Sequence, residues 1–237
     1  MTFSLKRVNA ILLKDWKDLL KNSYIIFTLA FPLIFAVILG KVEAEAEGPQ
    51  TTFLINFALV ISGCFVQAAM IAEEKEKNTL RGLLLSPAST LEVLVGKSAL
   101  SAIVTIIVII GSILLSGFEP PSIFLFSLNV FLCLIIYITL GTLLGLFSRN
   151  VMETTIIGMP VLMIFGVGSL LKNVVDSKIL LKIISFLPNE QSDIILSELS
   201  KNGGFNDVMN NLLILVVWVV IMLAVTFYTY GKRRFDK

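Results

Sequence analysis

The chain has 237 residues, of which 56% are apolar and 15% are charged. Soluble domains carry about 25% charged and about 45–50% apolar residues, so this composition indicates an integral membrane protein with no room for a large globular domain. The sequence has no histidine, which excludes His-based catalytic triads, HExxH zinc sites and histidine proton relays.

Residues 3–21 have apolar side chains at three- and four-residue spacing, with Lys and Arg between them. This pattern predicts an amphipathic helix in the membrane interface, with its lysines toward anionic headgroups. Lys14, Trp16 and Lys17 are its candidate interfacial residues. The alternative is a positively charged flank that only orients the first membrane span.

Six apolar runs of membrane length follow, which predicts an all-α integral membrane protein with one transmembrane domain over residues 1–237. The predicted spans are about 24–40, 52–72, 93–116, 123–147, 153–171 and 212–230. Gly141 and Gly145 in the fourth span have the small-residue spacing that lets two helices approach closely. Glycine is common in membrane helices, so this spacing also arises by chance.

No charged residue lies deep in any predicted span, which argues against an ion-coupled carrier and against an intramembrane protease. Cys64 and Cys133 lie inside apolar runs, where we expect buried small residues rather than a disulfide or a metal pair. No metal site is predicted. The scattered polar positions in the spans are Asn56, Gln67, Asn129 and Tyr137. Such residues either line a path for an amphipathic substrate or bond to one another between helices.

An apolar piece over residues 179–187 precedes the last span and is too short to cross a bilayer. It ends at Pro188. We therefore expect an interfacial or re-entrant segment on the side opposite to the termini, and Phe186, Leu187 and Pro188 are its candidate residues.

Positive charges are unevenly distributed between the two predicted faces. Six spans put both termini on one side, and fourteen of the 19 Lys and Arg residues fall in segments on that side. The other five are Lys41, Lys172, Lys178, Lys182 and Lys201. Because cytoplasmic loops carry the excess of Lys and Arg, we expect both termini to be cytoplasmic.

The densest charge cluster, E-E-K-E-K over residues 73–77, lies between the second and third spans. It predicts a docking loop over 73–87 through which a soluble partner moves the membrane part. Ser86-Pro87 disfavours helix, and Ser89 and Glu92 have capping-box spacing at the start of the next helix. Gly96-Lys97-Ser98 is similar to the end of a phosphate loop, but Leu91 stands where a glycine is required. We therefore interpret Lys97 as a surface-reaching lysine.

The segments E-E-K-E (73–76), Thr79-Leu80, L-L-S-P (84–87) and Gly96-Lys97 together resemble the cytoplasmic loop of ABC-2 type exporter permeases. Asn78 stands where that family usually has glycine, and Asn also adopts left-handed geometry. The resemblance extends to the amphipathic N-terminal helix, the six spans and the Pro-containing segment before the last span.

The resemblance implies a division of labour. Two copies of a separate cytoplasmic ATPase would use ATP and Mg²⁺, and this chain would be a transporter subunit rather than an enzyme and would bind no cofactor. A second permease chain, identical or different, would complete the path in a bacterial plasma membrane, and nucleic acid is not a partner. The implied ATPase-coupling residues are Glu73, Glu74, Glu76, Thr79, Leu80, Leu84, Leu85, Ser86 and Pro87.

The substrate implied by the apolar path is an amphipathic peptide, a drug or another lipophilic compound that leaves the cytoplasm. Two alternatives stay open within the exporter interpretation, namely sodium and a lipid-linked glycan. A different class of function is a membrane immunity or sensor protein that acts by binding, without transport.

Overall fold

The computed structural model describes residues 3–43, 50–77, 79, 88–120, 122–172 and 177–233. Within these ranges the secondary structure is helical and contains no strand, which confirms the all-α class. The helices are α1 (Leu5–Lys21), α2 (Ser23–Glu43), α3 (Gln50–Ala58), the π-helix η1 (Leu59–Phe65), α4 (Val66–Glu76), α6 (Thr90–Ser116), α7 (Ile123–Phe147), α8 (Val151–Leu171), α9 (Lys178–Ser185), α10 (Pro188–Ser200) and α11 (Phe205–Arg233).

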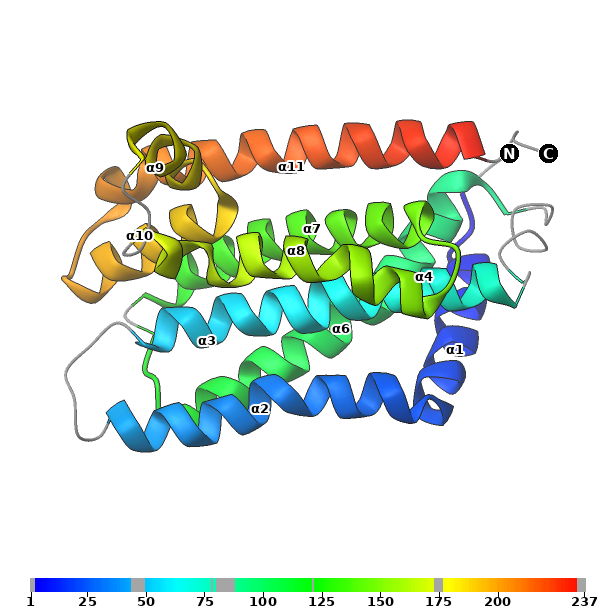
Figure 1. The fold of residues 1–237 in the computed structure, drawn as a ribbon, viewed down its shortest axis with the longest axis horizontal. Coiled ribbons are helices and arrows are strands. Elements are labelled where there is room, and N and C mark those ends of the chain that lie inside the picture. The colour runs from blue at the N-terminus through cyan, green and yellow to red at the C-terminus, as the bar shows by residue number, and fades with distance from the viewer. Residues whose placement is uncertain are drawn as a thin grey trace.

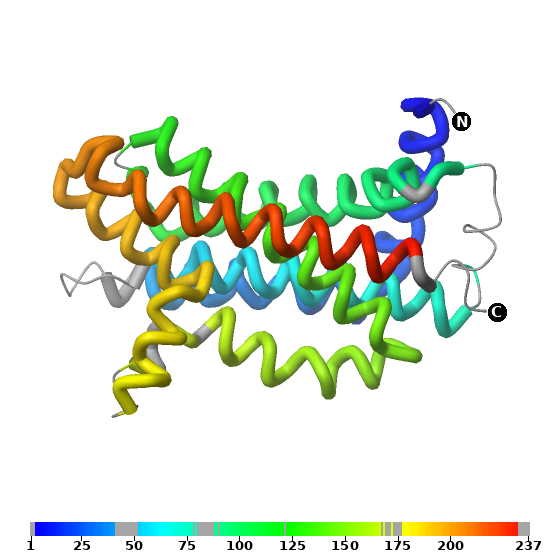
Figure 2. Tube along the Cα trace, turned by 90° about the horizontal axis from the view of Figure 1, so that it is seen from above, coloured from blue at the N-terminus to red at the C-terminus, as the bar shows by residue number. Residues whose placement is uncertain are grey.

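Figure 1 shows the long helices side by side along the long axis of the molecule, with α1 crossing them at one end. The start of α6 and the end of α11 lie at this same end, which we call the terminus side, and α9 and α10 lie at the other end. Figure 2 shows α9 projecting away from the bundle.

Five helical stretches in the described part of the chain are long and apolar enough to cross a membrane. They are 23–40, 52–76, 91–116, 123–147 and 205–231. The predicted span 153–171 corresponds to α8, whose described apolar stretch Val151–Gly166 is shorter, so a sixth span remains a prediction. The last spanning helix begins at residue 205 rather than at 212.

The second spanning stretch is one rod made of α3, η1 and α4, and most of its residues are buried at the centre of the bundle. A π-helix of this length is unusual, because such wide turns occur mostly as single bulges in α-helices. The rod continues to Glu76. Glu73–Glu76 therefore belong to a helix and not to a loop, in contrast to the docking loop predicted from residue 73.

The glycine pair in α7 packs against this rod. A Cβ atom on Gly141 would overlap the carbonyl group of Cys64, and one on Gly145 would lie 2.7 Å from the carbonyl oxygen of Ala68. Only hydrogen fits at both positions, so the predicted close approach of two helices is confirmed.

The helix ends follow local sequence signals. Ser89 and Glu92 form the predicted capping box, with the Ser89 amide donating to Glu92 Oε2 at 2.7 Å and the Glu92 amide donating to Ser89 Oγ at 3.3 Å. Gly117, with φ of 74°, ends α6 in left-handed geometry. Pro188 is the first residue of α10, where its missing N–H is harmless.

Candidate functional site

The last turn of α4 consists of Glu73, Glu74, Lys75 and Glu76, and we call it the terminal turn. Successive residues on an α-helix point about 100° apart, so four in a row face all round the axis. Each of the four side chains bonds to a different neighbour, as the next paragraphs describe.

Glu73 faces the joint between α1 and α2. Asn22, the residue between these two helices, donates from Nδ2 to Glu73 Oε2 at 2.7 Å. Glu73 also forms an ion pair with Lys77, which follows it by four residues and so lies one helical turn away. Hydrogen bonding to Glu73 raises the pKa of Lys77.

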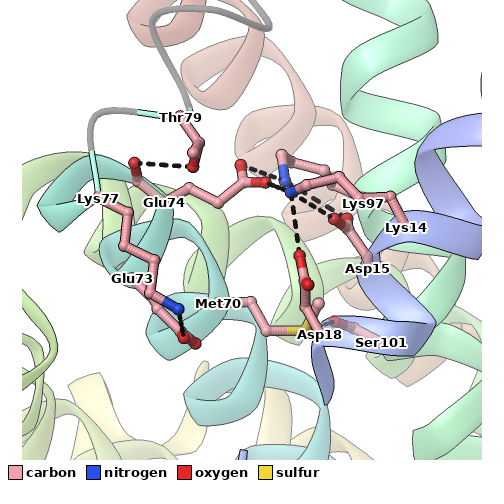
Figure 3. A network of polar contacts seen from close by, with 10 residues as sticks. All are labelled: Lys14, Asp15, Asp18, Met70, Glu73, Glu74, Lys77, Thr79, Lys97 and Ser101. Atoms are coloured by element: carbon pink, nitrogen blue, oxygen red, sulfur yellow. Dashed lines mark hydrogen bonds and ion pairs between the residues drawn. The ribbon is translucent and has the colours of Figure 1, made fainter. Parts of the chain in front are cut away.

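Glu74 is buried and forms ion pairs with Lys14 of α1 and Lys97 of α6 (Figure 3). Asp15 completes the group, with Oδ2 at 3.3 Å from Lys97 Nζ and Oδ1 at 3.3 Å from Lys14 Nζ. The Lys97 and Asp15 side chains are only 4% and 3% exposed. Buried charges persist only when they are paired, and these two carboxylates and two ammonium groups balance one another.

The same cluster shifts the pKa values of Asp15 and Lys14, its two residues on α1. Burial raises the pKa of the Asp15 carboxyl, and the charges of Lys97 and Lys14 oppose that shift without cancelling it. Burial acts to lower the pKa of Lys14, but its hydrogen bond to Glu74 and the charges of Glu74 and Asp15 outweigh this, so the pKa of Lys14 is raised. The cluster therefore holds Lys14 as a cation.

Lys75 binds the end of α7. Its ammonium donates to the carbonyl oxygens of Leu146 at 2.7 Å and Gly145 at 3.4 Å, and also to that of Ser148. The last carbonyls of an α-helix have no partner within the helix and carry partial negative charge. Lys75 supplies both the missing donor and the opposite charge.

Glu76 makes the reciprocal contact at the start of α8, where its Oε2 accepts a hydrogen bond from the Val151 amide at 3.3 Å. Free N–H groups at a helix start attract a carboxylate. The terminal turn is thus bonded to the α1–α2 joint, to α1 and α6, to the end of α7 and to the start of α8.

Apolar side chains surround the terminal turn on its inner side. One buried cluster combines residues of α1, α4, α6, α7 and α11, namely Ile11, Ile71, Val93, Leu146 and Tyr230, together with Ala88. These contacts exclude water from the polar bonds and so strengthen them.

Helix α1 is also fastened directly to α6. Arg7 pairs with Glu92 at 2.7 Å, and the same carboxylate accepts a bond from the Ser4 amide. Further along, a Cβ on Gly96 would lie 3.0 Å from Ile11, so the two helices touch closely there. The first turns of α6 are therefore joined to α1 by polar bonds and by close packing.

The sequence-predicted residues of this region have different outcomes. Glu73, Glu74 and Glu76 bond within the chain, and Thr79 donates from Oγ1 to the Glu74 carbonyl at 3.2 Å. Trp16 and Lys17 are exposed on α1. The remaining predicted coupling residues, Leu80, Leu84, Leu85, Ser86 and Pro87, lie outside the described residues.

Two charged residues of the cluster were not identified from sequence. Lys97 is buried, so its interpretation as a lysine that reaches the surface is wrong. Asp15 lies among the basic residues of α1 and is not one of the predicted site residues. The signal was its spacing, because Val8, Ile11, Asp15 and Leu19 follow one another at three- or four-residue steps and form the buried face of α1.

The four polar residues considered as path-lining are all buried in the single chain. Asn56 donates to Asp193 Oδ1 at 2.6 Å, and Gln67 donates to Thr142 at 3.0 Å. Asn129 donates to Ser192 at 2.9 Å, and Tyr137 donates to the Phe165 carbonyl at 3.2 Å. Each bond joins two helices, and a role in lining a path stays a prediction.

The segment before the last span is a hairpin of α9 and α10. Phe186 is exposed, Leu187 and Pro188 are buried, and Trp218 of α11 donates from Nε1 to the Phe186 carbonyl at 2.8 Å. Helix α10 packs against α11, α8, α3 and α7, whereas α9 is amphipathic and largely exposed.

Comparison with known protein families matches residues 43–228 to the family described as "ABC-2 family transporter protein". A search of curated proteins finds no match. The family match covers more than half of the chain, including three of the five span-capable helices in full, most of a fourth, and the whole terminal turn. Together with the apolar helices, it identifies a multi-pass membrane permease of the ABC transporter type, and the chain therefore belongs to the ABC-2 transporter family.

Proposed function

We propose that this chain is the permease subunit of an ATP-driven exporter and that the terminal turn of α4 receives the movement of a separate ATPase. The observation that carries the proposal is that four consecutive residues, Glu73–Glu76, bond to the α1–α2 joint, α6, α7 and α8. A force applied to the chain just after residue 76 would reach all of these helices at once.

The chemistry of the terminal turn suits such a transmission. Breaking one partner of a buried ion pair is costly, by about 3–5 kcal/mol, because the other charge is left uncompensated. The cluster of Glu74, Lys14, Lys97 and Asp15 therefore resists partial rupture and favours movement as a unit. Packed cores of this kind switch between discrete arrangements rather than deforming continuously.

The proposed seat for the ATPase is the segment that follows the terminal turn in the sequence, residues 77–87, together with α1. Under this proposal the terminus side of the molecule would face the cytoplasm of a bacterial cell, and two ATPase copies and a second permease chain would complete the transporter. ATP and Mg²⁺ are used by the ATPase.

Helix α8 would be the sixth span, and the α9–α10 hairpin would narrow the outer mouth. The proposed cargo is an amphipathic peptide, a drug or another lipophilic compound.

The first test is to purify the tagged chain from its native membranes in mild detergent and to identify its partners by mass. We expect a stoichiometric soluble protein with a phosphate-binding loop, together with a second copy or a relative of this chain. Recovery of the chain alone, under conditions that keep a known transporter complex intact, would overturn the proposal in favour of a membrane protein that acts by binding.

A second test addresses transmission. In the purified complex, Met163→Cys places a reporter thiol on the exposed side of α8, and its labelling rate is compared with and without ATP and Mg²⁺. We expect the ATP effect to vanish when Glu76→Leu is added, because leucine cannot accept the Val151 hydrogen bond, and to persist with Glu198→Leu, a control position on α10 at the opposite end. An ATP effect that persists in both variants would remove the terminal turn from the coupling route.

A further inference from the structure

A groove of about 730 Å³ lies between α6, α7 and α11 in the described part of the chain. Its floor is formed by buried side chains of α7, including Leu134, Ile138 and Thr142. Its rims are exposed apolar side chains, among them Val95 of α6 and Phe227 of α11. Pockets that bind drug-sized molecules have similar volumes, of about 300–1,000 Å³.

The groove exists because α6 presents small side chains to it. Ser98, Ala99 and Ala102 line this side, and their short side chains leave space that larger side chains would fill. On its other side α6 is held against α1 by the Lys97–Asp15 pair and by the close contact at Gly96. The groove therefore results from the way in which the helices pack against one another.

The hydroxyl groups of the floor are used within the protein. Thr139 donates to the Ile135 carbonyl at 2.7 Å, Thr142 donates to the Ile138 carbonyl at 2.9 Å, and Thr226 donates to the Thr139 carbonyl at 3.3 Å. A polar occupant would gain little from these satisfied groups and would lose its own hydration. The lining therefore favours a hydrocarbon occupant.

The position and length of the groove match one leaflet of a bilayer. Its lining on α6 and α11 comes from the terminus-side halves of these span-capable helices, and its lining on α7 runs from Phe131 to Thr142, around the middle of that helix. On α6 the lining runs from Leu91 to Ala102, which corresponds to about 17 Å at about 1.5 Å per residue. Half of a hydrocarbon core about 30 Å thick is about 15 Å. A lipid chain of one leaflet fits this length, whereas a spanning helix of a second copy would need twice as much.

The helix turn nearest the Leu91 end of the groove carries a positively charged residue, Lys6. Leu91 adjoins Glu92, which binds the Ser4 amide and Arg7, so the first turn of α1 is beside the groove opening. Lys6 in that turn is exposed. We propose that the groove holds one acyl chain of an anionic phospholipid from the terminus-side leaflet, with the phosphate beside Lys6.

The experiment measures the phospholipid that stays with the purified chain after extensive washing in mild detergent, by native mass spectrometry. Ala99→Trp fills the groove, and Ile110→Trp adds the same side chain at an exposed position of α6 outside it. We expect the wild type and Ile110→Trp to retain one phospholipid per chain, mainly anionic, and Ala99→Trp to lose it. Lys6→Glu should keep the total and reverse the preference for anionic lipid.

Three outcomes would overturn this inference. The first is a wild-type chain that retains no phospholipid, or an Ala99→Trp variant that retains as much as Ile110→Trp. The second is efficient disulfide formation between two Val95→Cys chains, which would assign the groove to a second copy. The third is retention of a compound that is not a phospholipid. None of these measurements depends on transport or on the ATPase, so their failure leaves the proposed function standing.

Discussion

Lys75 Nζ lies 2.7 Å from the carbonyl oxygen of Leu146 and so connects the end of the central rod to the end of α7. The two helix ends approach the same membrane surface with opposite chemistry, an ammonium group against unpaired carbonyls. This contact gives the terminal turn a role inside the permease, besides any role in contacting a partner.

Lys75→Met tests that contact, because methionine keeps much of the length and loses the charge and the donors. We expect a loss of about 2 kcal/mol in stability, since the last carbonyls of α7 would be left unpaired. The unfolding midpoint in detergent can be followed with a thiol-reactive dye, because Cys64 and Cys133 are both buried. Lys77→Met is the matched control, since Lys77 is 62% exposed and pairs with Glu73 near the end of the same helix. Equal midpoints for the two variants would contradict the assignment.

The buried charge cluster predicts a non-additive pair of substitutions. Lys97→Met alone leaves two buried carboxylates with only Lys14 to balance them, and we expect it to cost about 3–5 kcal/mol. Adding Asp15→Asn restores the balance and should recover part of that loss. The quantity to compare is the unfolding midpoint of the double variant against the Lys97→Met chain. A further decrease in the double variant would show that the charges do not act as one group.

The raised pKa of Asp15 predicts that stability depends on pH with a sign opposite to that for an ordinary paired carboxylate. Because burial raises its pKa above the usual 3.8, the folded state binds more protons than the unfolded state in the range between the two values. The stability of the wild type relative to Asp15→Asn should therefore increase as the pH falls through that range. Unfolding midpoints of both chains between about pH 7 and about pH 4 check this. A wild type that loses stability relative to Asp15→Asn as the pH falls would refute it.

Gly141→Ala should destabilise the bundle, because its Cβ would overlap the Cys64 carbonyl and neither backbone can retreat easily. Overpacking of this kind costs about 1–3 kcal/mol. Gly231→Ala serves as the control, since no described residue lies within 4 Å of the added Cβ there. Alanine favours helix over glycine, so the control should be neutral or slightly stabilising. Thermal unfolding of both variants distinguishes packing from a general effect of the added methyl.

Local signals explain what could be predicted from the sequence. The fourth predicted span, 123–147, coincides with α7, and the capping box at Ser89 and Glu92 fixed the start of α6. Both depend on residues close to one another in the chain. The sequence did not predict that the last helix begins at residue 205, because residues 205–211 are largely polar. There, Val208 is buried and Asn211 donates to Gln191 of α10 at 2.8 Å, so a partner far along the chain stabilises the extra turns.

In the candidate site, too, local features could be predicted from the sequence and long-range contacts could not. The charged residues at 73–77 were visible in the sequence, but a run of alternating charges is normally solvated and gives no partner for any one of them. Lys97 and Asp15 pair only because α1 crosses α6 at Gly96. That crossing depends on tertiary packing, which periodicity within either helix does not specify.

The bonds at the two ends of the central rod constrain the number of residues between them. At one end Asn56 bonds to Asp193 at 2.6 Å, and at the other Glu74 pairs with Lys97, with η1 between them. One residue inserted or deleted between these positions would turn one end by about 100° relative to the other. Both sets of bonds could then not form together. We therefore expect natural relatives to keep the number of residues from 56 to 74 constant and to vary in length elsewhere.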